Sequence, residues 1–187
     1  MLIISPDTFD RGTELPFQCL FEKPVVWVWP KRFLKGNEMN PIPHKDSILL
    51  FEGGNDVNPA LYKQLVGHRT QKPDIERDIH EQSYFEMAKS VGAAMIGVCR
   101  GAQLLCVLNG GSLIQDAKGH QVWHQIAVPD KYDRIRFQTS SAHHQVMNPY
   151  VLPKTDWQSF GYAINHSPGK YKDGNNNKVK VYKCWPE

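Results

Sequence analysis

A short apolar run that leads through a glycine-flanked cysteine into an amphipathic stretch constrains the fold of this chain most. Ala93–Val98 has the length of a buried strand and runs into the motif Gly97-Val98-Cys99-Arg100-Gly101-Ala102-Gln103. Apolar residues then recur at helical spacing from Arg100 to about Leu108, where Asn109-Gly110-Gly111 breaks the pattern. The sequence therefore predicts a strand, a tight turn and a helix.

Three earlier runs also predict strands, because they are apolar, rich in β-branched or aromatic residues, and bounded by Pro, Gly or Asp. They are Leu2–Ser5, Val25–Trp29 and Ser47–Phe51. Asp74–Ser90 carries an approximate helical stripe that Gly92 ends. Alternating strands and helices predict an α/β fold of three layers, a mainly parallel sheet with helices on both faces.

The later sequence is less regular. Val122–Val128 and Ile135–Thr139 are expected to form a hairpin, and Val179–Tyr182 alternates like an edge strand. A length of 187 residues suits one compact domain, so we expect 1–187 to be a single domain. Apolar residues at 41% and charged residues at 22% are typical of a globular protein rather than a disordered one.

Composition also indicates which cellular location and which partners to expect. No apolar stretch approaches the roughly 20 residues of a membrane span, and the N-terminus lacks the features of a secretory signal, so a cytoplasmic location and no membrane partner are expected. Four cysteines without paired spacing predict reduced thiols. The net charge of +3 is spread along the chain, and nucleic acid is not an expected partner.

Cys99 admits two interpretations. Free cysteine is among the most buried residue types, so a core cysteine is the ordinary expectation. A cysteine on a strand-to-helix turn, however, lies at the N-terminus of a helix, where the dipole favours thiolate over thiol. Gly97 and Gly101, where a side chain would obstruct the turn, favour the nucleophile. Cys106 lies mid-helix on the apolar face and is expected in the core.

A second candidate element follows the strand Ser47–Phe51. The paired glycines Gly53 and Gly54 there can present a backbone N–H to an oxyanion, and the N–H of Arg100, just after the cysteine, is the natural second donor. Taken alone, a pair of glycines is also consistent with an ordinary turn.

Four segments together resemble the γ-glutamyl-γ-aminobutyrate hydrolase branch of the class I glutamine amidotransferases, in order and in spacing. With 142–145, which reads Ala-His-His-Gln, the resemblance covers about Leu49 to Gln145. The segments are Gly53-Gly54-Asn55-Asp56-Val57-Asn58-Pro59-Ala60-Leu61-Tyr62, Arg77-Asp78-Ile79-His80-Glu81, the cysteine motif, and Asn109-Gly110-Gly111-Ser112-Leu113-Ile114-Gln115-Asp116.

The resemblance implies a flavodoxin-like class I glutamine amidotransferase fold and a cysteine hydrolase that needs no cofactor or metal. Cys99 would attack the γ-amide of glutamine or of a γ-glutamyl amine, pass through a glutamyl-thioester, and release ammonia or an amine, which a partner ligase or synthetase could receive. The matching positions imply oxyanion binding at Gly53, Gly54 and Arg100, substrate binding at Gln103, His143, His144 and Gln145, and structural support from Arg77, Asp78 and Glu81.

The general base is where the chain departs from the family. A late His-Pro-Glu supplies that base in the family, whereas Trp185-Pro186-Glu187 stands here. Two explanations stay open: tryptophan replaces the histidine, or the natural protein continues past Glu187 into a further strand that carries it, which we favour. The histidines that could stand in are His143, His144 and His166, with His120 and His124 behind them.

Three further hypotheses concern a metal site, a protein without catalytic activity and a different enzyme. A metal cluster of His120, His124, His143 and His144 has little support, because no cysteine or carboxylate stands at ligand spacing. A catalytically impaired member that binds a glutamyl ligand or a partner protein remains an alternative to an enzyme. A different cysteine hydrolase with the same turn would leave the Gly-Gly-Asn-Asp-Val-Asn-Pro block unexplained.

Overall fold

The structure is a computed structural model. It describes residues 2–4, 11–22, 25–29, 34–36, 38–117, 123–129, 134–140, 143–148, 151–153, 157–158, 162–163, 171–172 and 178–179.

Contacts divide the chain into two compact units. One unit comprises Met1–Asn58 and Gln71–Leu108, and the other comprises Pro59–Thr70 and Asn109–Glu187. This division does not test whether residues 1–187 form a single domain, which stays a prediction.

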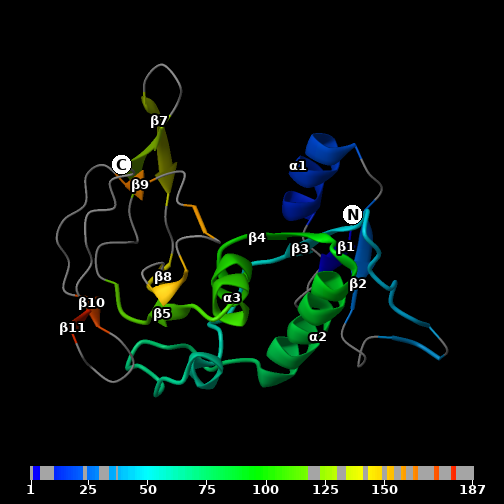
Figure 1. Ribbon diagram of the computed structural model, residues 1–187, viewed down its shortest axis with the longest axis horizontal. Coiled ribbons are helices and arrows are strands. Elements are labelled where there is room, and N and C mark those ends of the chain that lie inside the picture. The colour runs from blue at the N-terminus through cyan, green and yellow to red at the C-terminus, as the bar shows by residue number, and fades with distance from the viewer. Residues whose placement is uncertain are drawn as a thin grey trace. The chain divides into compact units, whose positions relative to one another are not determined.

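The first unit is built on a four-stranded parallel sheet of order β2-β1-β3-β4 (Figure 1). Its strands are β1 (Leu2–Ile4), β2 (Val26–Val28), β3 (Ile48–Phe51) and β4 (Ala94–Gly97). All four strands were predicted to within two residues at each end. In the register of β3 and β4, Phe51 pairs with Gly97, so the carboxyl ends of these strands lie side by side.

Helices cover both faces of this sheet. The chain passes from β1 through α1 (Arg11–Phe21) to β2 at one edge, and from β3 through α2 (Ile75–Val91) to β4 at the other. Crossovers between parallel strands are almost always right-handed, so helices on connections that run toward opposite edges of a sheet are expected on opposite faces. Figure 1 shows α1 above the strands and α2 below them, with α3 (Arg100–Leu108) on the side of α2. The predicted three layers are therefore confirmed.

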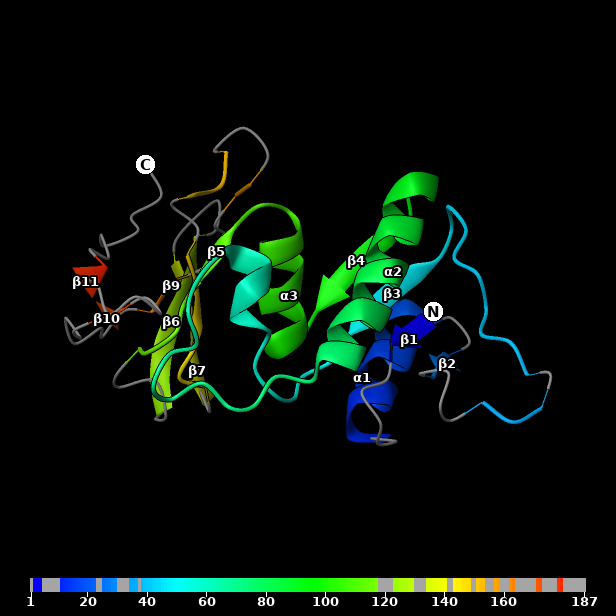
Figure 2. The same cartoon turned by 90° about the horizontal axis from the view of Figure 1, so that it is seen from below.

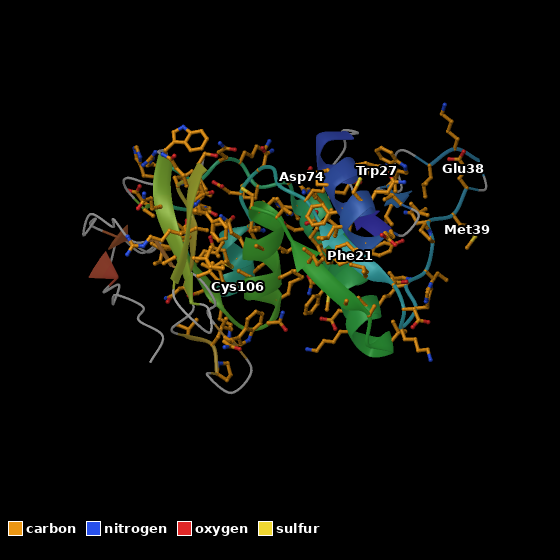
Figure 3. The ribbon with its side chains drawn as sticks, turned by 90° about the horizontal axis from the view of Figure 1, so that it is seen from above. Phe21, Trp27, Glu38, Met39, Asp74 and Cys106 are labelled. Atoms are coloured by element: carbon orange, nitrogen blue, oxygen red, sulfur yellow. The ribbon has the colours of Figure 1, made fainter. Side chains whose placement is uncertain are left out.

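The core of this unit follows the alternation of β3. Leu50 is fully buried and packs with Phe17 and Phe21 of α1 and with Trp27 of β2; Phe21 and Trp27 are labelled in Figure 3. Leu49 and Phe51 point to the opposite face and are equally buried. The sheet is thus apolar on both sides, as its near-continuous hydrophobic strands predict.

Both predicted helices have the expected ends. The carboxylate of Asp74 caps α2 by accepting a hydrogen bond from the backbone N of Arg77 at 3.0 Å, and Gly92 ends the helix at φ 70°. The predicted bounds of α3 agree with the observed Arg100–Leu108. Helix α1 was not predicted, because Pro16 lies inside it and prolines usually mark helix ends.

The second unit contains antiparallel pairs. Strands β6 (Trp123–Pro129) and β7 (Arg134–Ser140) form the predicted hairpin, seen side by side in Figure 2, and β9 (Tyr162–Ala163) pairs with β6. Strand β5 (Ser112–Ile114) pairs with β8 (Val146–Asn148), and β10 (Tyr171–Lys172) pairs with β11 (Lys178–Val179). Residues 180–182 of the predicted edge strand lie outside the described residues. A 3-10 helix, η2, spans Pro59–Tyr62.

Among the described residues, no helix combines the length and apolar character that crossing a membrane requires.

Candidate active site

Cys99 lies on a strained turn between β4 and α3. Its φ is 52°, in the left-handed region that residues with a side chain rarely adopt, and the side chain is exposed. The backbone N of Val98 still donates to the carbonyl of Phe51 at 2.9 Å, so the sheet holds the chain up to the residue before the cysteine. A nucleophile on a sharp strand-to-helix elbow has this geometry.

Two glycines make this turn possible, as predicted. A Cβ added to Gly97 would overlap the backbone of Gly101 and Ala102, and a Cβ added to Gly101 would overlap the carbonyl of Phe51. The first turn of α3 therefore packs directly on the ends of β3 and β4. As the first residue of α3, Arg100 has its backbone N–H in the turn whose N–H groups find no partner within the helix.

The loop after β3 lies beside the cysteine. A Cβ added to Gly53 would be 3.5 Å from the Cβ of Cys99, and Gly54 has φ 138°, a conformation that favours glycine. The structure thus brings together the predicted nucleophile and the predicted oxyanion loop at the carboxyl ends of adjacent parallel strands. Oxyanion binding itself stays a prediction.

Four charged side chains form a buried network beneath this loop. Glu81 accepts from Nε of Arg77 at 2.8 Å with one carboxylate oxygen and from Nη1 of Arg100 with the other. Arg100 also donates from Nη2 to Asp78. All four side chains are at most 3% exposed. The family resemblance implied Arg77, Asp78 and Glu81 as structural support. Asp78 and Glu81 bond the residue after the nucleophile, and Arg77 joins them through Glu81.

Burial dominates the electrostatics of this network. It lowers the pKa of Arg77, against the opposing effect of Glu81, and raises the pKa of Asp78, against the opposing effect of Arg100. Removing one member of a buried ion pair typically costs about 3–5 kcal/mol, since it leaves an uncompensated charge. The network therefore fixes the elbow and α2 in one arrangement.

The same helix also holds the loop that follows Gly54. Asp78 accepts from the backbone N of Asn58 at 3.1 Å, and Asp56 accepts from the backbone N of Gln71 at 2.7 Å. The Gly-Gly-Asn-Asp-Val-Asn-Pro block is thus tied to α2 through Asp78 and to the segment ahead of α2 through Gln71.

Gln103 is a buried residue of α3, and its backbone N donates to the carbonyl of Cys99 at 3.2 Å. Its predicted contact with substrate is not tested by this position. Cys106, labelled in Figure 3, lies on the same helix and is 3% exposed, so the predicted core cysteine is confirmed. Burial raises the pKa of its thiol to about 11.

The predicted substrate-binding residues His143, His144 and Gln145 belong to the second unit. Nδ1 of His144 lies 3.1 Å from the carbonyl of Gln115, Nδ1 of His143 lies 2.9 Å from the carbonyl of Gln145, and Gln145 is buried. His120, His166 and 185–187 lie outside the described residues, as does the side chain of His124.

Gln115 is a structural residue that sequence reasoning did not single out. Its side-chain amide donates to Gln64 and to the carbonyl of Leu65, and its oxygen accepts from Gly67 and Thr70, all at 2.7–2.9 Å. It thereby fixes the segment after η2 to the end of β5. The sequence feature that could have identified it is its place in the Asn-Gly-Gly-Ser-Leu-Ile-Gln-Asp block.

The chain is similar to a known protein family and to several known proteins. Residues 39–152 match the Peptidase C26 family. Protein NtpR of Enterococcus hirae is 35% identical over 75 residues, which cover 40% of this chain and 31% of that protein. A glutamine amidotransferase-like protein of Lactococcus lactis subsp. cremoris, the YvdE homolog, is 35% identical over 129 residues, which cover 59% of this chain and 68% of that protein.

Among solved structures, the crystal structure of SMU.1228c has a TM-score of 0.50 at 16% identity, covering 87% of this chain and 68% of that one. This likeness concerns the fold. The chain spans about a third of NtpR and about two thirds of the YvdE homolog.

Proposed function

Because the chain belongs to the Peptidase C26 family, we propose that it hydrolyses the γ-amide of glutamine or of a γ-glutamyl amine through Cys99. One observation carries the proposal: the exposed Cys99 sits at φ 52° on the elbow, next to the Gly53-Gly54 loop. A strained, exposed cysteine at a helix N-terminus suits nucleophilic attack rather than packing. The γ-glutamyl-γ-aminobutyrate hydrolase branch is the one its motifs resemble.

The chemistry proceeds in two steps. The Cys99 thiolate adds to the amide carbon, and the N–H groups of Gly54 and Arg100 bind the resulting oxyanion. Collapse breaks the C–N bond, the nitrogen leaves with a proton as ammonia or an amine, and a glutamyl-thioester remains. Water then adds to the thioester, and its collapse returns the thiol and releases glutamate.

Both steps need a group that moves protons. His143, His144 and His166 are the candidates that the sequence offers. A positioned base contributes typically about 10²–10⁴-fold to the rate, so its loss should reduce turnover far more than ligand binding.

The proposal also covers substrate binding, the use of the released ammonia and the location of the protein. Gln103, His143, His144 and Gln145 would bind the glutamyl portion of the substrate. Released ammonia could be used by a separate ligase or synthetase, and a reducing cytoplasm would keep Cys99 as a thiol.

The test compares Cys99 with Cys19, which is also exposed. The chain is treated with a diazo-ketone analogue of glutamine, digested and analysed by mass spectrometry, and amine release is measured from glutamine and several γ-glutamyl amides. We expect saturable labelling of Cys99, protection by substrate, and no amine release by Cys99→Ala, while Cys19→Ala behaves as the parent. Labelling at Cys19 or Cys106 with Cys99 untouched would disprove the assignment.

Labelling of Cys99 without amine release would instead support an impaired member that binds a glutamyl ligand.

A further inference from the structure

Arg77 forms hydrogen bonds to the backbone of the glycine loop beside Cys99. Its Nη2 donates to the carbonyl of Glu52 at 3.1 Å and to the carbonyl of Gly53 at 2.9 Å. Nη1 of the same guanidinium occupies the space that a Cβ on Gly54 would take. One terminal nitrogen of this buried guanidinium therefore fixes two consecutive carbonyls of the loop, while Nε in the same plane donates to Glu81.

Fixing the carbonyl of Gly53 also fixes the N–H of Gly54. No peptide among the described residues is cis, and in a planar trans peptide the C=O of one residue and the N–H of the next point in opposite directions. Because the carbonyl of Gly53 points at Arg77, the N–H of Gly54 points away from it. Rotation of this peptide would break the 2.9 Å hydrogen bond.

Glu81 connects this loop to the elbow. One carboxylate oxygen accepts from Arg77, which holds the loop, and the other accepts from Arg100, whose backbone N–H is the second proposed oxyanion donor. The side chain of Glu81 is fully buried, so water does not compete for either bond. A single carboxylate thus links the two backbone segments that would bind one oxyanion.

We propose that Arg77 and Glu81 are positioning residues that hold the N–H groups of Gly54 and Arg100 in the arrangement that binds the oxyanion of the tetrahedral adduct. The inference rests on the proposed function of Cys99. Neither side chain touches the substrate, and the effect of each reaches the reaction through a backbone N–H.

The competing explanation is that the network only stabilises the fold. Two electrophilic reagents, both of which react with the sulfur of Cys99, separate the two explanations. A chloroketone analogue of glutamine reacts through addition to its carbonyl, which creates an oxyanion, whereas iodoacetamide loses iodide by direct displacement at carbon and creates none. The ratio of the two inactivation rate constants therefore reports oxyanion binding and is insensitive to a uniform loss of active protein.

The variants are Arg77→Lys, Arg77→Met and Glu81→Gln, with Tyr84→Phe as the matched control. Lysine keeps the positive charge beside Glu81 but has one nitrogen where arginine uses two, Nε for Glu81 and Nη2 for the carbonyls. Tyr84→Phe removes a hydrogen bond to the carbonyl of Pro41 from a buried residue of the same helix and leaves the four charged side chains in place. Urea unfolding of each variant identifies any that fails to fold, and Arg77→Lys is the variant on which the decision rests if Arg77→Met does.

One oxyanion donor is worth about 10²–10³-fold in rate. We expect Arg77→Lys and Arg77→Met to lower the chloroketone-to-iodoacetamide ratio at least about 30-fold, and Glu81→Gln about 10-fold, less than the full effect of one donor because the N–H is misplaced rather than removed. Tyr84→Phe should lower stability and keep the ratio. An unchanged ratio in Arg77→Lys, with saturable chloroketone inactivation of the parent, would overturn the inference alone. Absence of saturable chloroketone inactivation in the parent would overturn the proposed function as well.

Discussion

The guanidinium of Arg77 fills the space in which a side chain on Gly54 would lie. This close packing joins a loop at the end of β3 to a helix that follows it in sequence. It also explains why a glycine stands at a position with φ 138°, since both the backbone conformation and the neighbouring guanidinium exclude a Cβ.

Gly54→Ala should therefore lower stability by two additive effects. The strained conformation costs about 1–3 kcal/mol, and displacement of the buried Arg77 adds about 1–3 kcal/mol. Gly92→Ala is the control, because Gly92 also has a positive φ of 70° but no atom within 4 Å of an added Cβ. Urea unfolding should give a loss at least about 1 kcal/mol larger for Gly54→Ala. Equal losses would mean that Arg77 yields without cost.

The strain at Cys99 predicts an unusual order of stability between two variants. The left-handed conformation at φ 52° costs a residue with a Cβ about 1–2 kcal/mol, and glycine avoids that cost. Cys99→Gly should therefore be more stable than Cys99→Ala by about 1 kcal/mol.

Cys19, inside α1, provides the matched comparison. In a helix interior alanine is favoured over glycine by about 1 kcal/mol, so Cys19→Ala should be the more stable variant at that position. The measurement is the free energy of unfolding in urea for the four variants. The same order at both positions would contradict the strained elbow.

Much of the first unit could be predicted because its sequence signals are local. Asp74 and Gly92 mark the two ends of α2, and the glycines around Cys99 mark the elbow. Helix α1 was missed because Pro16 contradicts the usual local rule. Strands β5 and β8 were missed because each has three residues and depends on its partner rather than on its own pattern.

The candidate site also has a part that local sequence predicts and a part that it does not. Cys99 and the glycine loop were found from residues adjacent in sequence, whereas the contacts of Arg77 with the carbonyls of Glu52 and Gly53 join separate segments. No periodicity or spacing predicts which carbonyl a buried guanidinium reaches. The family resemblance indicated that Arg77 and Glu81 matter, and the geometry supplies a physical reason.

The buried thiol of Cys106 predicts a loss of stability at alkaline pH. Burial raises its pKa from 9.0 to about 11 in the folded protein. The unfolded chain therefore releases this proton first as the pH rises, and ionisation favours unfolding. The stability that the protonated, buried thiol contributes is fully present below about pH 9 and is lost progressively toward about pH 11.

At about pH 10 the expected loss from Cys106 is about 1.4 kcal/mol relative to about pH 8, since one pKa unit corresponds to about 1.4 kcal/mol. Cys106→Ala provides the control, because its cavity lowers stability by an amount that does not depend on pH. Burial also raises the pKa of Tyr84, to about 12, but this group is present in both proteins. Urea unfolding at the two pH values should show a smaller decrease for Cys106→Ala, by about 1 kcal/mol. Equal decreases in the two proteins would mean that the thiol ionises as easily in the folded state as in the unfolded chain, which contradicts its burial.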